Sequence, residues 1–390
     1  MVWNRVKVGD LGRVVTGKTP KTAEKDNYGG DIMFVTPSDD MDSKYIYSTG
    51  KTITKKGMDS VKGAIIPAET ICVSCIGSDL GKVVITTEEC VTNQQINSII
   101  VDTVKYDIDF VYYSMLILGK ELNFHSKTST AVPIVNKSSF SSYEINCPTL
   151  DEQKRIAGIL TTIDQKIEEN GRINDNLQEQ MESLYKAWFK DFIPFNGDCP
   201  TNWKKADIYS IANIIYGAPF SSKLFNTDGD GMPIIRIRDL REQIFVTYTT
   251  EQHPKGHLIQ PGDIVVGMDG EFRPYIWGNT EAWLNQRVCI FENKRPKGKA
   301  FVLYTIKPLL YQIEQTQVAT TVIHIGKKDY DAFEFYLPDN DTLDQFDEIT
   351  SPMIDQIVVN CLENKRLAEI RDAILPKLMS GELDVSTLEL

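Results

Sequence analysis

The chain has 390 residues and a formal net charge of −12, with 42 lysine and arginine against 54 aspartate and glutamate side chains. It opens with no charged-then-apolar leader and contains no apolar run of about 18 residues, so we expect neither secretion nor a membrane span and place it in the cytoplasm. Its seven cysteines are an odd number without the spacing of a disulfide framework.

Residues 1–149 are predicted to form a mainly β globular segment. Short apolar or alternating runs such as "TICVSC", "GKVVITTEE" and "INSIIVDT" are separated by turn-forming residues. One helix is predicted over "DFVYYSMLILGKEL". "IGSDLGKVV" resembles a phosphate loop, but its glycines are one residue too close, so Gly77 and Gly81 are interpreted as turn glycines between strands.

A long helix is predicted next, over residues 150–191. Its uncharged side chains recur at alternating steps of four and three residues, and a period of about 3.5 is typical of a coiled-coil seam. At about 1.5 Å per residue, Glu152 to Lys190 would form a rod of roughly 58 Å, whose seam needs a covering partner. The seam residues are Ile156, Leu160, Ile163, Ile167, Asn170, Asn174, Leu177, Met181, Leu184 and Trp188.

Residues 192–338 repeat the pattern of the first segment. A shift of 200 residues aligns Trp3 with Trp203, Gly17 with Gly217, and "DIMFVTPSD" with "GMPIIRIRD". "TNQQI" likewise matches "LNQRV", and a helix is predicted over "AFVLYTIKPLLYQIEQ". Such a period indicates two copies of one domain, each about 145 residues and large enough for its own core.

The final segment, residues 339–390, is predicted to supply the partner helix. Its seam has the same spacing and again contains two asparagines, Asn360 and Asn364. Antiparallel packing would place Asn170 against Asn364 and Asn174 against Asn360. Buried asparagine pairs fix the register of a coiled coil at some cost in stability. The alternative is that they mark a frayed, wetter middle of the rod. The seam residues are Met353, Ile357, Asn360, Asn364, Leu367, Arg371, Ile374 and Leu378.

The predicted fold is therefore α+β: two pseudo-repeated, β-rich mixed α/β domains separated by two long helices that pair as an antiparallel coiled coil. With these elements in order, the chain resembles the specificity subunit of type I restriction–modification systems over essentially its full length. The runs that support this resemblance are "CPTLDEQKRIAGIL", "LPKLMSGEL", "TGKTPKT", "YGGDI", "PGDIVVGMDGEF" and "LNQRV". The second helix begins "LPDNDTLDQFDEI" and departs from the family's "EQKRIA" pattern, so the two helix starts are not closely equivalent.

The resemblance implies a DNA-recognition protein without catalysis or a cofactor of its own. Each globular segment would be a target-recognition domain reading one half of an asymmetric, split target in double-stranded DNA. The helices would set the gap between the halves and dock two methyltransferase subunits, with restriction subunits joining in the full complex. Half-sites read from one face of the duplex would lie about one helical turn, ~34 Å, apart.

The acidic net charge is concentrated in the helices. Residues 151–190 contain eight acidic and six basic side chains, and residues 339–390 contain twelve and four, which leaves the globular segments nearly neutral. Acidic helices would face protein partners, with basic patches local to each domain; an ordinary solvated helix face fits the same counts. We therefore expect the isolated chain to bind DNA weakly, with its partners supplying many phosphate contacts.

Candidate DNA-contacting residues follow from the usual chemistry of readout, in which Arg contacts guanine, Asn or Gln contacts adenine, and Lys, Ser or Thr contacts phosphate. "RIRD" alternates, so Arg236 and Arg238 are expected on one face of a strand. For each candidate the alternative is a solvated side chain or a structural ion pair, and the matching positions of Asn93-Gln94 and Asn285-Gln286 favour a structural role. The candidates are Lys18, Thr19, Lys21, Lys51, Lys55, Lys56, Asn93, Gln94, Arg236, Arg238, Arg241, Arg273 and Arg287.

Two other functions remain open from the sequence. A DNA-modifying enzyme is disfavoured, because neither half contains a methyl-donor fingerprint or an Asn-Pro-Pro-aromatic run for a flipped base. The second is a scaffold of two binding modules on a coiled coil that does not bind DNA. No metal site is predicted, since Cys72 and Cys75 lack a second pair with ligand spacing, and His253 and His257 lack the glutamate of a zinc-protease helix.

Overall fold

The computed structural model describes residues 3–41, 43–127, 134–270, 272–316 and 324–385. These form two compact units, Met1–Gln165 with Leu367–Leu390, and Lys166–Arg366. Two long helices, α4 (Leu150–Phe189) and α7 (Asn340–Ser380), each contribute to both units. None of the helices in these ranges is long and apolar enough to span a membrane.

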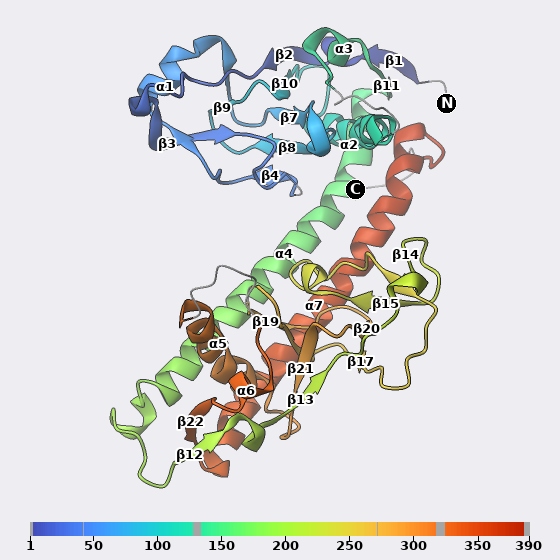
Figure 1. The fold of residues 1–390 in the computed structure, drawn as a ribbon. Coiled ribbons are helices and arrows are strands. Elements are labelled where there is room, and N and C mark those ends of the chain that lie inside the picture. Colours follow the sequence, from blue (N-terminus) through green and yellow to red (C-terminus); the bar gives the residue numbers. More distant parts are fainter. Residues whose placement is uncertain (1–2, 42, 128–133, 271, 317–323, 386–390) are drawn as a thin grey trace. The chain divides into compact units, whose positions relative to one another are not determined.

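The first unit is built on a five-stranded sheet (Figure 1). Antiparallel pairs join β2 to β10, β10 to β7 and β7 to β8, whereas β4 pairs with β8 in parallel. Helix α2 (Ile108–Lys127) packs on β7 and β8 and corresponds to the helix predicted there. In sheet order the strands are β2 (Gly12–Thr16), β10 (Ile96–Val101), β7 (Ile71–Ser74), β8 (Val83–Thr86) and β4 (Tyr45–Ile46).

A smaller four-stranded sheet extends the same unit. Its strands, in sheet order, are β5 (Thr52–Ile53), β3 (Tyr28–Val35), β9 (Cys90–Thr92) and β6 (Ile65–Ile66). Helix α1 (Lys55–Ser60) packs beside β3 and β5. The remaining elements are the antiparallel pair β1 (Asn4–Lys7) and β11 (Glu144–Cys147), and helix α3 (Lys137–Ser142). Gly77 and Gly81 lie between β7 and β8 with positive φ, which confirms that they are turn glycines.

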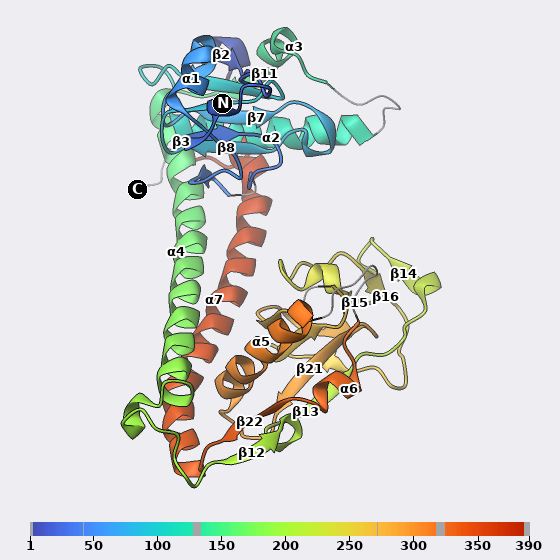
Figure 2. The same cartoon turned by 60° about the vertical axis from the view of Figure 1, so that its left-hand side comes forward.

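The second unit repeats this arrangement (Figure 2). Its main sheet consists of β13 (Ala212–Tyr216), β21 (Val288–Asn293), β18 (Ile264–Gly267) and β19 (Pro274–Ile276), on which α5 (Lys299–Thr316) packs through β19 and β21. A second sheet, of five short strands, consists of β14 (Phe225–Asn226), β16 (Tyr248–Thr249), β15 (Met232–Ile235), β20 (Ala282–Leu284) and β17 (Leu258–Ile259). β12 (Lys204–Asp207) pairs with β22 (Glu334–Leu337), and α6 (Lys327–Tyr330) precedes β22.

The repeat extends to individual backbone contacts. A Cβ on Gly17 would lie 2.1 Å from the carbonyl oxygen of Asn93, and one on Gly217 would lie 2.0 Å from that of Asn285. No side chain fits at such a distance, so glycine is required at both positions. The sequence match between these residues therefore reflects one packing solution used twice.

Both cores include side chains from the long helices. In the second unit, Tyr185 and Phe189 of α4 and Phe346 of α7 pack with Phe301 of α5, with ring centroids 4.9–6.4 Å apart. In the first unit, α4 and α7 contribute Ile156, Leu160, Leu375 and Leu378. Each globular part is thus anchored on the helices by burial of apolar surface, worth roughly 25 cal/mol per Å².

The start of α7 supplies a pH-dependent prediction. The Asp339 carboxylate accepts hydrogen bonds from the Thr342 backbone N–H at 2.9 Å and from the Trp203 indole at 3.3 Å. The Thr342 bond, the largest cause, lowers the pKa of Asp339 below 3.8. Removing this N-cap by Asp339→Ala should lower the free energy of unfolding by about 1 kcal/mol at pH 7.

The pH dependence has a definite sign. Because the folded pKa is depressed, the contribution is fully present above the unfolded value near 3.8 and is lost as pH falls through the folded pKa. Urea titrations of both proteins should therefore differ at pH 7 and converge once the pH lies below the folded pKa of Asp339. Asp341→Ala, next in the first turn, is the control; an Asp339 effect independent of pH would contradict the prediction.

Candidate nucleic-acid interface

The predicted asparagine pairs are present where α4 and α7 pack within the second unit. Asn170 Nδ2 donates to Asn364 Oδ1 at 2.8 Å, and Asn360 Nδ2 donates to Asn174 Oδ1 at 2.8 Å. Asn170 Nδ2 also reaches Glu363 at 2.7 Å, and Asn364 Nδ2 donates to the Ile167 carbonyl at 3.1 Å. Three of the four amides are buried, and the pairing confirms that the helices are antiparallel.

Within the first unit the same two helices are joined by an ion pair. Arg371 on the α7 seam donates to Asp164 of α4 at 2.9 Å, and the Tyr113 hydroxyl of α2 donates to the same carboxylate at 2.5 Å. Lys44 lies beside them, 2.9 Å from Asp109 and 5.0 Å from the Tyr113 ring centroid. This network connects α2 and Lys44, the residue before β4, to both long helices.

The first-half candidates lie in two connected groups of loops. Lys18 and Thr19 follow β2, and the Thr19 hydroxyl donates to Gln94 Oε1 at 2.6 Å in the loop before β10. These loops meet because Thr16 and Asn97 are cross-strand partners in the β2–β10 ladder. Lys18 and Gln94 are exposed, which leaves their polar ends available to a ligand.

The second group lies around α1. Lys56 pairs with Asp26 at 3.3 Å and Lys55 with Asp59 at 4.0 Å, while Lys21 pairs with Glu24 at 3.6 Å. All three lysines are exposed, and such surface pairs are weak enough to exchange for phosphate. Lys51 is exposed at the start of β5 and holds the strand through its backbone carbonyl.

Asn93 has structural contacts. It is 8% exposed; its Nδ2 donates to Gln95 Oε1 at 2.9 Å, and its Oδ1 accepts from the Gln95 backbone at 3.0 Å. Its own N–H donates to the Val35 carbonyl, as that of Asn285 does to Ile235. The matched asparagines therefore share a turn geometry, as their repeat positions indicate.

Arg236 and Arg238 are not on a strand, so that part of the sequence prediction is wrong. β15 ends at Ile235, and residues Ile237–Asp239 form a 3-10 turn. The cause is Asp239, whose carboxylate accepts the Arg236 backbone N–H at 3.0 Å and draws the chain out of the sheet. Burial raises the pKa of Asp239, opposed by that hydrogen bond and by Arg238. Both arginines are nevertheless exposed.

The other three arginines have different surroundings. Arg241 is exposed and lies 3.6 Å from Glu242. Arg287 follows the Asn285-Gln286 turn, with its Nε 3.7 Å from Asp269, which also contacts His324 at 2.5 Å. Arg273 is paired with Glu314 and lies over the Tyr311 ring, so its guanidinium has a structural partner as well.

Thr36 and Ser38 are two further polar residues at the candidate surface, beyond those predicted from residue type. They follow β3 at the turn that matches Arg236 and Arg238, and the Thr36 backbone N–H donates to Asp39 Oδ2 at 2.7 Å. The aligned runs "FVTPSD" and "IIRIRD" indicate these positions. Among their last four residues only the final aspartate is shared, so the residues before it differ between the two halves.

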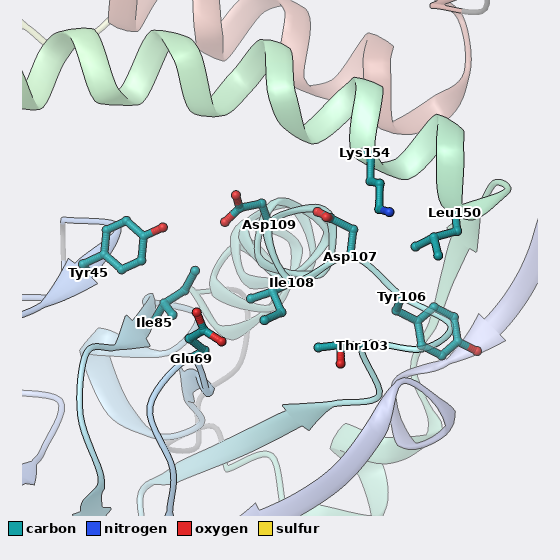
Figure 3. Close-up of a pocket in the computed structure, with 10 residues that line it drawn as sticks. All are labelled: Tyr45, Glu69, Ile85, Thr103, Tyr106, Asp107, Ile108, Asp109, Leu150 and Lys154. Atoms are coloured by element: carbon teal, nitrogen blue, oxygen red, sulfur yellow. The ribbon is translucent and has the colours of Figure 1, made fainter. Parts of the chain in front are cut away.

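A polar pocket of about 290 Å³ lies in the first unit at the starts of α2 and α4. Figure 3 shows Lys154 extending from α4 on one side of this pocket, Asp107 and Asp109 at the start of α2, and Glu69 and Tyr45 on the other side. None of the predicted DNA-contacting residues lines it. We therefore place the candidate interface on the loops and not in this pocket.

The described ranges contain no cluster of three or more potential metal ligands among His, Cys, Asp and Glu. Cys72 and Cys75 are both buried, and burial raises the pKa of their thiols to about 12 and about 11. Both side chains are therefore protonated, packed residues of the β7 region.

Comparisons with known proteins agree on one family. The family model for the type I restriction modification DNA specificity domain matches residues 2–179 and 200–371. The chain is 27% identical to the type I restriction enzyme MjaIX specificity subunit of Methanocaldococcus jannaschii, over 99% of this chain and 94% of that protein. It is 38% identical to the EcoBI specificity subunit of Escherichia coli over 33% of this chain and 27% of that protein.

A solved structure has the same fold. The crystal structure of a type I restriction–modification S subunit from M. genitalium superposes with a TM-score of 0.54 at 18% identity, covering 97% of this chain and 96% of that one. The expected plan of two mixed α/β domains and two long antiparallel helices is thereby confirmed.

Proposed function

This chain belongs to the type I restriction–modification DNA specificity family, and from that membership we propose that each of its globular segments, residues 1–149 and 192–338, reads one half of a bipartite, asymmetric DNA target. The observation that carries the proposal is the double match of the family domain, whose two segments each contain one globular half and most of the long helix that follows it. The alternative of a scaffold that does not bind DNA is not favoured by a match to a DNA specificity domain.

The helix pair is proposed to set the number of unspecified base pairs between the half-sites. The support is the amide network of Asn170, Asn174, Asn360 and Asn364, whose side chains bond across α4 and α7 in this alignment, although Asn170 Oδ1 is buried without a hydrogen-bond partner among the described residues. A slip of either helix would leave buried amides unpaired, each costing about 1–3 kcal/mol. The antiparallel pairing thus favours one spacing.

The chain acts within a complex with DNA and other restriction–modification subunits. We propose that two methyltransferase subunits dock along the acidic helices, that restriction subunits join in the full complex, and that catalysis resides in those partners. The charge distribution supports separate roles for the helices and the domains, since the long helices carry most of the net −12 and the exposed candidate lysines and arginines lie in the globular segments.

Base and phosphate contacts are proposed for the candidate residues of each half. Lys18, Lys21, Lys51, Lys55 and Lys56 are placed on phosphates, because a lysine ammonium on a flexible stem suits a point charge. Thr19 and Gln94, which bond each other, remain candidates together with Asn93. In the second half the candidates are Arg236, Arg238, Arg241, Arg273 and Arg287.

The test is to co-express the chain with its methyltransferase in a host free of methylation and to map modified bases across the genome. A split, asymmetric motif is expected, and exchanging residues 1–149 for those of another family member should change one half only. A single continuous motif, or no modified motif with the methyltransferase folded and bound, would refute the proposal.

A further inference from the structure

Each half contains one turn that uses the same backbone scaffold with different outward side chains. In the first half it is Thr36–Asp39 after β3; in the second it is Arg236–Asp239 after β15. The aspartate carboxylate accepts the N–H of the first turn residue at 2.7 and 3.0 Å, and its own N–H donates to that residue's carbonyl at 3.0 and 2.9 Å.

The strands beneath the two turns also match. Val35 pairs in parallel with Thr92, and Ile235 with Leu284, so each turn stands next to the Asn-Gln turn of its own half. The backbone N–H groups of Asn93 and Asn285 donate to the last strand residue at 3.0 and 3.3 Å. The second residues, Pro37 and Ile237, face inward and are buried or half-buried.

The outward positions differ in chemistry. In the first half, the Thr36 and Ser38 hydroxyls lie 2.8 Å apart, and Thr36 also donates to Asp39 at 2.8 Å, so these hydroxyls satisfy one another. In the second half, the same positions carry the exposed arginines Arg236 and Arg238. Proteins that read two different sequences with one fold need fixed scaffold residues beside variable contacting residues, and this turn provides both.

The guanidinium groups of Arg236 and Arg238 have different contacts within the protein. Arg238 is oriented by Thr247, to which Nη2 donates at 3.2 Å, and by Asp239, 3.5 Å from its Nε. The Arg236 guanidinium is exposed, and its charge acts on the Asp239 carboxylate, whose pKa it lowers against the effect of burial. An oriented, exposed guanidinium with free N–H donors matches the O6 and N7 acceptors that guanine presents in the major groove.

We infer that the outward residues of the aspartate-capped turn determine sequence specificity, and that Arg236 and Arg238 read guanine in the half-site of residues 192–338. This rests on the proposed function and deepens it by naming the base class of one half-site. The first half-site is read without arginine at this turn, since short hydroxyls cannot form the paired contacts to guanine.

The experiment maps modified bases directed by the full complex containing the wild-type chain, Arg236→Ala, Arg238→Ala or Arg5→Ala. Arg5 is the matched control, an exposed arginine of β1 paired with Glu144 at 3.5 Å. In each of the first two variants, one guanine of the same half-site should become degenerate, with discrimination at that position falling about tenfold or more. The other half-site and the Arg5→Ala motif should stay unchanged.

A second readout separates base contact from a change in folding. Replacing the affected guanine by 7-deazaguanine removes the N7 acceptor, so it should weaken DNA binding by the wild-type complex and leave the matching alanine variant's affinity unchanged. This inference is overturned, and the proposed function stands, if the wild-type chain directs a split motif that both variants retain. The same holds if neither strand of that half-site contains guanine. If the wild-type complex directs no split motif, both are overturned.

Discussion

Asp164→Ala is expected to lower the free energy of unfolding by about 3–5 kcal/mol, because it leaves the Arg371 guanidinium partly buried without its principal partner. The side chains of Asp164 and Arg371 are only 13% and 29% exposed, and their 2.9 Å pair joins α4 to α7. The Tyr113 hydroxyl would lose its acceptor in the same variant. Urea denaturation at pH 7, followed by circular dichroism, measures the change.

A double variant separates the ion pair from packing. Asp164→Leu with Arg371→Leu removes both charges and should recover most of the loss, since apolar replacement of a buried pair is often neutral or stabilising. Arg172→Ala is the surface control, because its partner Glu168 is an exposed neighbour on α4 and such pairs contribute about 0.5 kcal/mol or less. A double variant as unstable as the single one would contradict this account.

Replacing Asn170, Asn174, Asn360 and Asn364 together by leucine is expected to raise the free energy of unfolding by about 1–4 kcal/mol. The substitution exchanges a buried polar network for apolar packing, and apolar replacement of such networks tends to stabilise. The same change should broaden the gap between half-sites in the mapped motif, because a leucine seam no longer penalises a slipped register. Thermal unfolding and the distribution of gap lengths are the two measurements.

The single variant Asn360→Leu serves as the control for this network. It removes the donor to Asn174 Oδ1 and the acceptor of Gln356 Nε2, while Asn174 Nδ2 still donates to Cys361 Sγ at 3.4 Å, so stability should fall. Unchanged stability and an unchanged gap in the fourfold variant would remove the register function from these asparagines.

The candidate DNA surface shows which residue roles local pattern can predict. The candidate lysines of the first half are exposed, as their residue type predicts, because burying a charged side chain in a small core is unfavourable. Asn93 looked like a base reader by residue type, yet it is buried at a turn. Its structural role depends on contacts with Val35 and Gln95. The sequence does not show that Val35, which is distant along the chain, lies beside Asn93 in the fold.

The amino-acid sequence alone determined the repeated plan, the two long helices and the asparagine pairing, because periodicity and internal repetition are written in the order of residues and each follows from local backbone geometry. Only the tertiary structure decided that Arg371, an apparent flaw in the seam, pairs with Asp164, and that Asp239 turns Arg236 and Arg238 out of the sheet. The reason is physical: a backbone period repeats every few residues, whereas the partner of a polar side chain is chosen by hydrogen bonding and burial among groups brought together after the chain has folded.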